Sequence, residues 1–498
     1  MFENLVHDII LALPILSWVL LALLVLIVQI FSKHIWIPLG VTIAGLVCIL
    51  AYSVFALNLS STHEIFFGAA IFDSLSQTFN LIGIGIALSV ILMLIPALHD
   101  NGVPVKANAE QLPEFLVCLL ISGFGLGVLA SAVDLTSLFL GLETLSIGIY
   151  CLCGFFRTEM KSTESAFKYL MIGAFSTVIF LYGIAFVYGS TGATHYSQIS
   201  LAIQQHIQAH GAVDPLLSLG VLFLMAGFAF KLAFVPFHLY IPDVYEGAPT
   251  PVTAYLATIV KVGAMAGAVR VFWGFLASVA PFWTGFWLDL SVLSILVGNV
   301  VALQQRTIKK LLAFSSISHA GFMGLALIAA KPEQGSLFPL LAYLIIYSVM
   351  TVGAFAIVSF LENRERTFHL EDLRGLGQRH FGIALVFSIF ILGLAGIPPF
   401  AGFMIKFWIL DGLIQQHYIW PAVAAVVGSL IGAGYYLRLL MLMFMSDDKI
   451  IARWSGTVVR DQYFVLRFVV ILAAVITLFG GLWPKLYADW IFGALALK

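Results

Sequence analysis

Residues 228–243 read FAFKLAFVPFHLYIPD, an apolar stretch that holds Lys231, with Pro236 and His238 a few residues after it. The chain has 498 residues, of which 61% are hydrophobic and only 10% are charged. Apolar runs of about 20 residues recur along it, without the period-two alternation of a transmembrane β-barrel. The composition therefore predicts an all-α polytopic membrane protein and excludes a soluble globular protein of this length.

The apolar runs between polar breaks predict about 14 transmembrane helices. They lie near 9–31, 35–57, 75–98, 113–131, 133–156, 169–189, 214–241, 251–276, 281–303, 311–330, 336–361, 381–411, 419–445 and 468–484. The acidic start MFENLVHDII lacks the basic region and cleavage site of a signal peptide, so the first run is expected to be a retained span. Because the connections are short, residues 1–498 are expected to form a single membrane domain.

Lysine and arginine are unevenly distributed between alternate connections. Of the 24 basic residues, the odd-numbered connections hold 16, whereas the even-numbered connections and both termini hold three. Because positively charged loops stay in the cytoplasm, both termini are predicted on the periplasmic side. The 16 are Lys33, Lys106, Arg157, Lys161, Lys168, Arg306, Lys309, Lys310, Arg364, Arg366, Arg374, Arg379, Lys449, Arg453, Arg460 and Arg467; the three are Lys331, Lys485 and Lys498.

The other five basic residues fall inside predicted spans: Lys231, Lys261, Arg270, Lys406 and Arg438. Arg270 and Arg438 lie nearer span ends, from which long side chains reach the interface. At about 1.5 Å per helical residue, a second group lies near mid-membrane depth. This group consists of Glu143, Lys231, Lys261, His319 and Lys406.

Charged groups at the bilayer centre are costly, at roughly 2.5–3.5 kcal/mol each on insertion scales. Two structural interpretations stay open: Glu143 and one lysine as a buried pair, and His319 as a satisfied core histidine. One glutamate cannot neutralise three lysines, however. A row of such groups bridged by water therefore predicts a proton relay.

Prolines interrupt two of the long apolar segments. Pro236 follows Lys231 by five residues, whereas the pair Pro398–Pro399 precedes Lys406 by seven. This opposite order is expected of inverted repeats, in which interrupted helices indicate the transport site. Backbone groups freed at such breaks must meet protein or water, which favours a hydrated path.

The four cysteines are Cys48, Cys118, Cys151 and Cys153, all in apolar runs and without CxxC or Cys/His spacing. We expect buried hydrophobic side chains rather than iron–sulfur or zinc ligands. No dinucleotide fingerprint or phosphate-binding loop is present in the sequence. The aromatic residues, 14% of the chain, are expected to serve packing and interfacial belts rather than a quinone site. The chain is therefore predicted to carry no cofactor, metal or redox group of its own.

Four stretches are similar to a known family: GLETLSIGIY (141–150), FKLAFVPFHLYIPDVYEGAPTPVTAYLATIVK (230–261), IKKLLAFSSISHAGF (308–322) and GIPPFAGFMIKF (396–407). They closely resemble the antiporter-like membrane subunits of respiratory complex I, the NADH–quinone oxidoreductase. The similarity covers nearly the whole chain and is greatest to the subunit N branch. Subunit M typically has glutamate where Lys406 stands, and subunit L is longer, with a lateral helix for which no room remains after the last predicted span.

The resemblance implies two inverted five-helix repeats at roughly 113–276 and 281–445, each with a broken helix. Three helices in 1–112 precede them and a last helix in 446–498 follows. It also implies a proton-translocating subunit in the bacterial inner membrane, driven by quinone reduction elsewhere in the complex. The whole complex uses NADH, FMN, iron–sulfur clusters and quinone, and the expected neighbours are the membrane-arm subunits M and K.

The resemblance further implies roles for the charged residues of the first repeat. Glu143 would pair with Lys231 and modulate its proton affinity. Lys231 would be the central protonatable lysine on the first broken helix. Lys261, with His238 nearby, would pass protons toward the second repeat.

In the second repeat the resemblance implies that His319 continues the axis and that Lys406 lies at the exit on the second broken helix. Lys309 is a weaker candidate, because it and Lys310 also fit positively charged anchors at the cytoplasmic side. Two other functions stay open: a subunit of a multi-subunit cation/proton antiporter, and a non-transporting scaffold, which fits the interrupted helices poorly. Dependence of activity on sodium separates the antiporter from the first interpretation.

Overall fold

The computed structural model describes residues 2–32, 34–57, 62–99, 111–330, 337–365, 369–445 and 464–496. The helices of the first half are α1 (Phe2–Phe31), α2 (Trp36–Leu57), α3 (Ser74–His99), α5 (Leu112–Ser131), α6 (Leu135–Cys153), α7 (Met160–Thr191), α8 (Tyr196–His210), α9 (Pro215–Lys231), α10 (Ile241–Gly247) and α11 (Thr250–Ala268). Those of the second half are α12 (Ala280–Ala302), α13 (Ile308–Ala329), α14 (Phe338–Glu365), α15 (Leu376–Arg379), α16 (Phe381–Ala395), α17 (Ala401–Gln415), α18 (Ile419–Phe444), α20 (Phe464–Leu482) and α21 (Lys485–Ala496).

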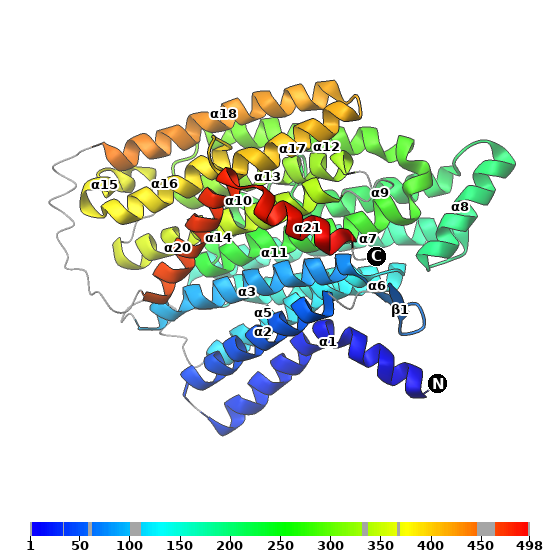
Figure 1. Cartoon of the computed structure of the whole chain (residues 1–498), viewed down its shortest axis with the longest axis horizontal. Helices are drawn as coiled ribbons and strands as arrows, with labels where there is room; N and C mark the ends of the chain where they lie inside the picture. The colour runs from blue at the N-terminus through cyan, green and yellow to red at the C-terminus, as the bar shows by residue number, and fades with distance from the viewer. Residues whose placement is uncertain are drawn as a thin grey trace.

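Irregular helices and one hairpin complete the described chain. A π-helical stretch, Val269–Phe275, continues α11, and 3-10 turns span Ala277–Val279 and Leu370–Leu373. Strands β1 (His63–Ile65) and β2 (Ala70–Phe72) pair antiparallel, with Glu64 opposite Ile71. In Figure 1 most long helices run in one common direction, with α8 at one end of the bundle and α15 at the other.

Twelve helical segments among the described residues are long and apolar enough to cross a membrane. Two further segments are interrupted: α9 followed by α10, and α16 followed by α17. When each interrupted segment is counted once, 14 segments lie where the sequence predicts them. The prediction of an all-α, multi-pass membrane fold is confirmed.

Proline and glycine explain both interruptions. Pro236 lies between α9 and α10, where a proline lacks the N–H and excludes helical geometry before it. The second break follows Gly396, whose φ of +80° ends α16 in the left-handed region. Both breaks contain a cis peptide bond, Val235–Pro236 in the first and Pro398–Pro399 in the second.

The two interrupted segments occupy equivalent places in the chain, each as the fourth segment of a five-segment series. The first series runs from α5 to α11 and the second from α12 to α18. The first two helices of each series pack backbone to backbone. A Cβ on Gly125 would lie 2.2 Å from the Leu145 nitrogen, and one on Gly298 would lie 2.7 Å from the Ser318 nitrogen.

The middle of the molecule is formed by α11, α13 and α14. Every residue of α11 is buried, and α13 is buried at all positions except Lys309, Lys310 and Phe314. In contrast, α1, α2, α7, α18 and α20 are each buried over less than two fifths of their apolar windows. The central helices are therefore shielded from the surroundings by other helices of the same chain.

Some elements differ from the expectation. Helix α7 begins at Met160, nine residues before the predicted span, because the polar first turns of a long helix extend beyond its apolar part. The amphipathic α8, the β1–β2 hairpin and α21 have no predicted counterpart. Each of these elements has too few apolar residues, or too short an apolar run, to be predicted as a transmembrane helix.

Arg270 is paired rather than extended toward an interface. Its Nη2 lies 2.7 Å from the Asp73 carboxylate, and its Nε donates to the Ala130 carbonyl at 2.8 Å. Burial alone would raise the pKa of Asp73, but attraction and hydrogen bonding by Arg270 outweigh it and hold the pKa below its usual value. The pair joins the start of α3 to the π-helical stretch that continues α11. Arg438, the other outlying arginine, donates to the Leu303 carbonyl at 3.2 Å.

The predicted burial of the cysteines is right for Cys153 but wrong for Cys48 and Cys151, which are exposed on this chain, and Cys118 is half-buried. Part of the predicted orientation pattern lies outside the described residues. The residues concerned are Lys33, Lys106, Lys331, Arg366, Lys449, Arg453, Arg460 and Lys498.

Candidate functional site

Lys231 is the last residue of α9 and is only 5% exposed. Its position follows from the break at Pro236, which leaves the amine at a helix end in the interior. The amine donates to the hydroxyl of Ser146 at 2.8 Å and to that of Tyr150 at 3.3 Å. The nearest carboxylate oxygen, Glu143 Oε1, lies 3.7 Å away. All three partners lie on α6, spaced along one helical face.

Glu143 lies closer to the surface of the chain than its lysine partner. Its side chain is 19% exposed, whereas that of Lys231 is 4% exposed. The hydroxyl of Thr177, on α7, donates to the same carboxylate oxygen at 2.7 Å. The carboxylate is therefore held between α6, α7 and α9.

Lys261 lies in the wholly buried α11 and is surrounded by hydroxyl groups. Its amine donates to both the carbonyl and the hydroxyl of Ser316. The Tyr347 hydroxyl lies 3.4 Å from the amine and 2.9 Å from the Ser316 hydroxyl. The Tyr245 hydroxyl approaches Ser316 from the other side at 3.1 Å. These contacts form a continuous polar cluster that spans α10, α11, α13 and α14.

His319, on α13, has a tyrosine at each ring nitrogen. Nδ1 lies 2.7 Å from the Tyr343 hydroxyl and Nε2 lies 3.4 Å from the Tyr436 hydroxyl. Tyr436 is also hydrogen-bonded to the hydroxyl of Ser315. The imidazole therefore connects α14 with α18 through groups that both donate and accept protons.

Lys406 lies on α17, just beyond the second break. Its amine donates to the carbonyls of Leu394 and Ala395, at 3.2 and 3.0 Å. These are carbonyls of the C-terminal turn of α16, which have no intrahelical partner and favour a positive charge. The amine also lies 4.8 Å from the centre of the Phe322 ring. Glycine is favoured at 396 because its φ of +80° strains any other residue, and a Cβ there would also crowd the Lys406 side chain.

A small cavity adjoins three of these groups. Its lining includes Ser315, Ser316, Tyr347, Thr351 and Leu394, and it has room for about one water molecule. Ser316 and Tyr347 bind the lysine of α11, Ser315 belongs to the histidine cluster, and the Leu394 carbonyl binds the lysine of α17. The cavity therefore lies where the polar clusters of Lys261, His319 and Lys406 meet.

His238 and Lys309 stand apart from these clusters. His238 is 8% exposed, lies in the first break with its ring 6.4 Å from that of Phe314, and has no contact with Lys261 among the described residues' hydrogen bonds. Lys309 forms an ion pair with Glu362 at 3.1 Å and donates to the Ala248 carbonyl at 3.2 Å. Lys309 is thus an ion-paired residue at the edge of the buried centre.

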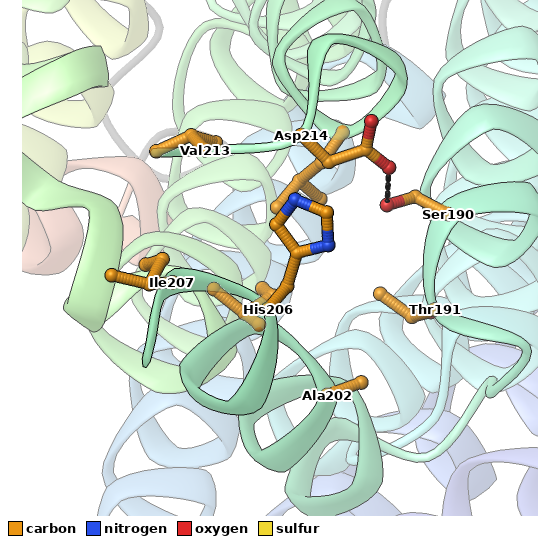
Figure 2. Close-up of a pocket in the computed structure, with 9 residues that line it drawn as sticks. Ser190, Thr191, Ala202, His206, Ile207, Val213 and Asp214 are labelled. Atoms are coloured by element: carbon orange, nitrogen blue, oxygen red, sulfur yellow. Dashed lines mark hydrogen bonds between the residues drawn. The ribbon is translucent and has the colours of Figure 1, made fainter. Parts of the chain in front are cut away.

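A second pocket lies between α7, α8 and the start of α9 (Figure 2). The Ser190 hydroxyl donates to the carboxylate of Asp214, and this bond, together with the Leu216 N–H, lowers the pKa of Asp214 below its usual value. His206 faces the same space in Figure 2. The pocket contains none of the predicted relay residues.

Sequence analysis identified the ionisable groups but not the hydroxyls around them. Ser146 and Tyr150 follow Glu143 by three and seven residues, a spacing that places all three on one helical face. Ser315 and Ser316 precede the histidine of α13 by four and three residues in the same way. This helical spacing was the available signal.

Comparison with known proteins identifies the family. Residues 132–432 match the family model described as NADH:quinone oxidoreductase/Mrp antiporter, TM. NADH-quinone oxidoreductase subunit N 1 of Herpetosiphon aurantiacus is 36% identical over 473 residues, which cover 94% of this chain and 93% of the relative. The chain belongs to the subunit N family. The subunit N of Moorella thermoacetica is 37% identical over 407 residues, 82% of each chain.

Two solved structures match this chain over nearly its whole length. A chain of respiratory complex I from Thermus thermophilus with bound aureothin is 31% identical, with a TM-score of 0.77 over 96% of this chain and 98% of that one. A chain of the Mrp complex from Dietzia sp. has a TM-score of 0.81 over 98% and 97% of the two chains. It is 19% identical, so this second likeness concerns the fold alone. The resemblance to antiporter-like subunits of complex I is confirmed.

Proposed function

We propose that this subunit N chain moves protons across the bacterial inner membrane within an NADH–quinone oxidoreductase, driven by quinone reduction elsewhere in the complex. One observation carries the proposal. Lys231, Lys261 and Lys406 are each at least 92% buried, yet each amine has polar partners. Amines enclosed in this way, among hydroxyls and carbonyls, are suited to gaining and losing protons rather than to solvation.

The first step of the relay is electrostatic. Glu143 is the carboxylate closest to Lys231, and a change in their separation alters how strongly the amine holds its proton. Tyr150, a partner of the amine, packs edge-to-face on Tyr169 at 4.7 Å, and Tyr169 stacks on Tyr240 at 5.5 Å. This row of tyrosines runs from the first lysine toward α10.

The second part of the relay passes through the hydroxyl clusters of α13 and α14. The Tyr245 hydroxyl meets Ser316, which binds Lys261. A water molecule in the adjoining cavity would connect this cluster with the Ser315 side and with the carbonyls that hold Lys406. The proton would then leave from the lysine of α17 on the periplasmic side.

The same proposal implies which subunits surround the chain and how it is oriented in the membrane. The membrane-arm subunits M and K would be its neighbours, and the redox centres would lie in other subunits. Residues 113–276 and 281–445 would be the two inverted repeats, between the segments 1–112 and 446–498. Both termini would be periplasmic. In support, the start of α1 and the end of α21 lie in the same half of the molecule as α8 (Figure 1).

A cation/proton antiporter remains the second candidate, because the matching family model covers both classes and the fold resembles an Mrp chain. The two candidates differ in sodium dependence. Proton pumping by the intact complex that needs no sodium supports the first function, and pumping that stops without sodium supports the second.

The direct test replaces the first lysine in the intact complex. Lys231→Ala is expected to reduce proton pumping at least tenfold and to lower the coupled quinone reductase rate. Arg438→Ala is the matched control, since the hydrogen bond that this intramembrane basic residue makes within the described part of the chain goes to a carbonyl near a helix end. If the complex with Lys231→Ala assembles and still pumps protons at the wild-type rate, the relay is wrongly assigned.

A further inference from the structure

Two cysteine thiols meet across neighbouring helices. Cys118 lies on α5 and Cys151 on α6, and the two thiols lie close enough to perturb each other electrostatically. The two residues are 33 positions apart in sequence, and both are free thiols. The proposed proton relay uses neither of them.

The packing of α5 on α6 explains this meeting. The helices run antiparallel, and glycines remove the side chains between them. A Cβ on Gly141 would lie 2.7 Å from the Leu129 nitrogen, and one on Gly148 would lie 2.6 Å from the carbonyl oxygen of Cys118. Cys151 is the next residue on this face of α6, so it stands opposite Cys118. Such close backbone approach suits a disulfide, which needs Cα atoms about 4.4–6.8 Å apart.

Cys151 is the more accessible of the two thiols on this chain. Cys151 is exposed and Cys118 is half-buried, whereas Cys153, two residues along the same helix, is buried. Cys151 lies two residues, or about 3 Å, from the C-terminal end of α6. That end leads to Arg157 and Lys161 in a connection predicted to be cytoplasmic. A cytoplasmic disulfide is usually transient and redox-responsive rather than structural.

We propose that Cys118 and Cys151 form a reversible dithiol site that hydroperoxides oxidise to an intramolecular disulfide. The Cys151 sulfur attacks the peroxide, the O–O bond breaks, and a sulfenic acid and one water form when the peroxide is hydrogen peroxide. The Cys118 sulfur then attacks the sulfenic sulfur, which forms the S–S bond and releases a second water. Two thiols lose two electrons and two protons, and the peroxide is reduced to two waters. Cytoplasmic thiols restore the pair by thiol–disulfide exchange.

The disulfide would fix α6 to α5 one residue beyond Tyr150. Helix α6 also carries Glu143 and Ser146, so the bridge would restrain the helix that holds the partners of Lys231. The dithiol site itself stands independently of the proposed relay, because it rests on the α5–α6 contact alone.

The test uses the intact complex in native membranes. Hydrogen peroxide is added, the protein is denatured, free thiols are alkylated, and peptides are identified by mass spectrometry. In the wild-type chain we expect a linked Cys118–Cys151 peptide, loss of two alkylatable thiols, and recovery of both after dithiothreitol. Cys48→Ser is the matched control and should behave as the wild type, because Cys48 is exposed on α2, away from the pair.

Two variants identify the order of the chemistry. In Cys118→Ser, dimedone should trap a sulfenic acid at Cys151, and no linked peptide should form. In Cys151→Ser, the Cys118 thiol should stay reduced. If both wild-type thiols remain free after peroxide, or if Cys151 links to Cys153 or to another subunit instead, the proposal is overturned.

Discussion

Glu143 Oε1 and Lys231 Nζ lie 3.7 Å apart, and each is held by a closer partner of its own. The amine donates to Ser146 at 2.8 Å, and the carboxylate accepts from Thr177 at 2.7 Å. The ion pair is therefore close but lacks a short direct hydrogen bond. Two unit charges at such a separation interact by about 4 kcal/mol at an effective dielectric constant near 20. Partial exposure of the carboxylate reduces this value, but small shifts between α6, α7 and α9 would still change it.

Removal of the Glu143 charge should disable the first step. Glu143→Gln keeps the shape and the hydrogen bond but abolishes the attraction to the amine, so we expect at least a tenfold loss of proton pumping. Pumping is measured in vesicles with the intact complex, alongside the quinone reductase rate. Glu159→Gln, an exposed residue at the start of α7, serves as the control and should keep full activity.

Thr177 is predicted to act as a positioning residue. A hydrogen bond to a charged group contributes about 1.5–3 kcal/mol, so Thr177→Val should release the carboxylate and lower pumping severalfold. The pH profile of pumping should also shift, which a purely structural role would not cause. Thr177→Ser keeps the hydroxyl and should restore both. Equal effects of the valine and serine variants would contradict this role.

Ser316 should matter more than other buried serines. Ser316→Ala removes a side-chain hydroxyl that contacts both Lys261 and Tyr347, and we expect pumping to fall about tenfold. Ser348→Ala is the matched control, because that hydroxyl donates to the Leu344 carbonyl of its own helix. Similar activity of the two variants would count against the hydroxyl cluster as part of the relay.

The Asp73–Arg270 pair is predicted to stabilise the fold. Asp73→Asn leaves the guanidinium without its buried counter-charge, and loss of one member of a buried pair costs about 3–5 kcal/mol. The folded-state pKa of Asp73 is depressed, so its contribution is complete above the unfolded value of about 3.9 and is lost as the pH falls through the lower folded value. Thermal unfolding of the complex should separate wild type from variant at pH 7, and the difference should shrink in acid below pH 4.

The proposed orientation can be read by chemical labelling. Gln205 on α8 and Arg157 after α6 are exposed and lie on connections predicted to face opposite sides. A membrane-impermeant maleimide should label Gln205→Cys in intact spheroplasts and Arg157→Cys only in inverted vesicles, each above the wild-type background. The reverse labelling pattern would show that the chain has the opposite orientation in the membrane.

The sequence indicates the buried lysines well, because a charge inside a long apolar run has few alternatives. It also locates both breaks, since Pro236 and Pro398–Pro399 cannot continue a helix. The partners are harder to predict. Ser316 is 55 residues from Lys261, and a serine in an apolar helix ordinarily bonds its own backbone. Which helix face meets which neighbour is a property of tertiary packing.

The cysteines illustrate the same limit. Cys151 and Cys153 share one apolar run, yet a helix turns by about 100° per residue, so two positions along place the side chain on the opposite part of the circumference. One is exposed and the other is buried. Hydropathy averages over the helix and cannot separate them.

The enclosure of α11 and of nearly all of α13 determines how these helices respond to the surrounding lipid. Other helices of the same chain surround them in any bilayer. Changes in acyl-chain length or headgroup charge should therefore leave the electric field at Lys261 and His319 nearly unaltered. Glu143, nearer the outer surface, lacks that insulation. If lipids, or a neighbouring subunit in their place, affect this subunit, they should therefore change the electric field at Glu143 and not the field at the buried Lys261 and His319.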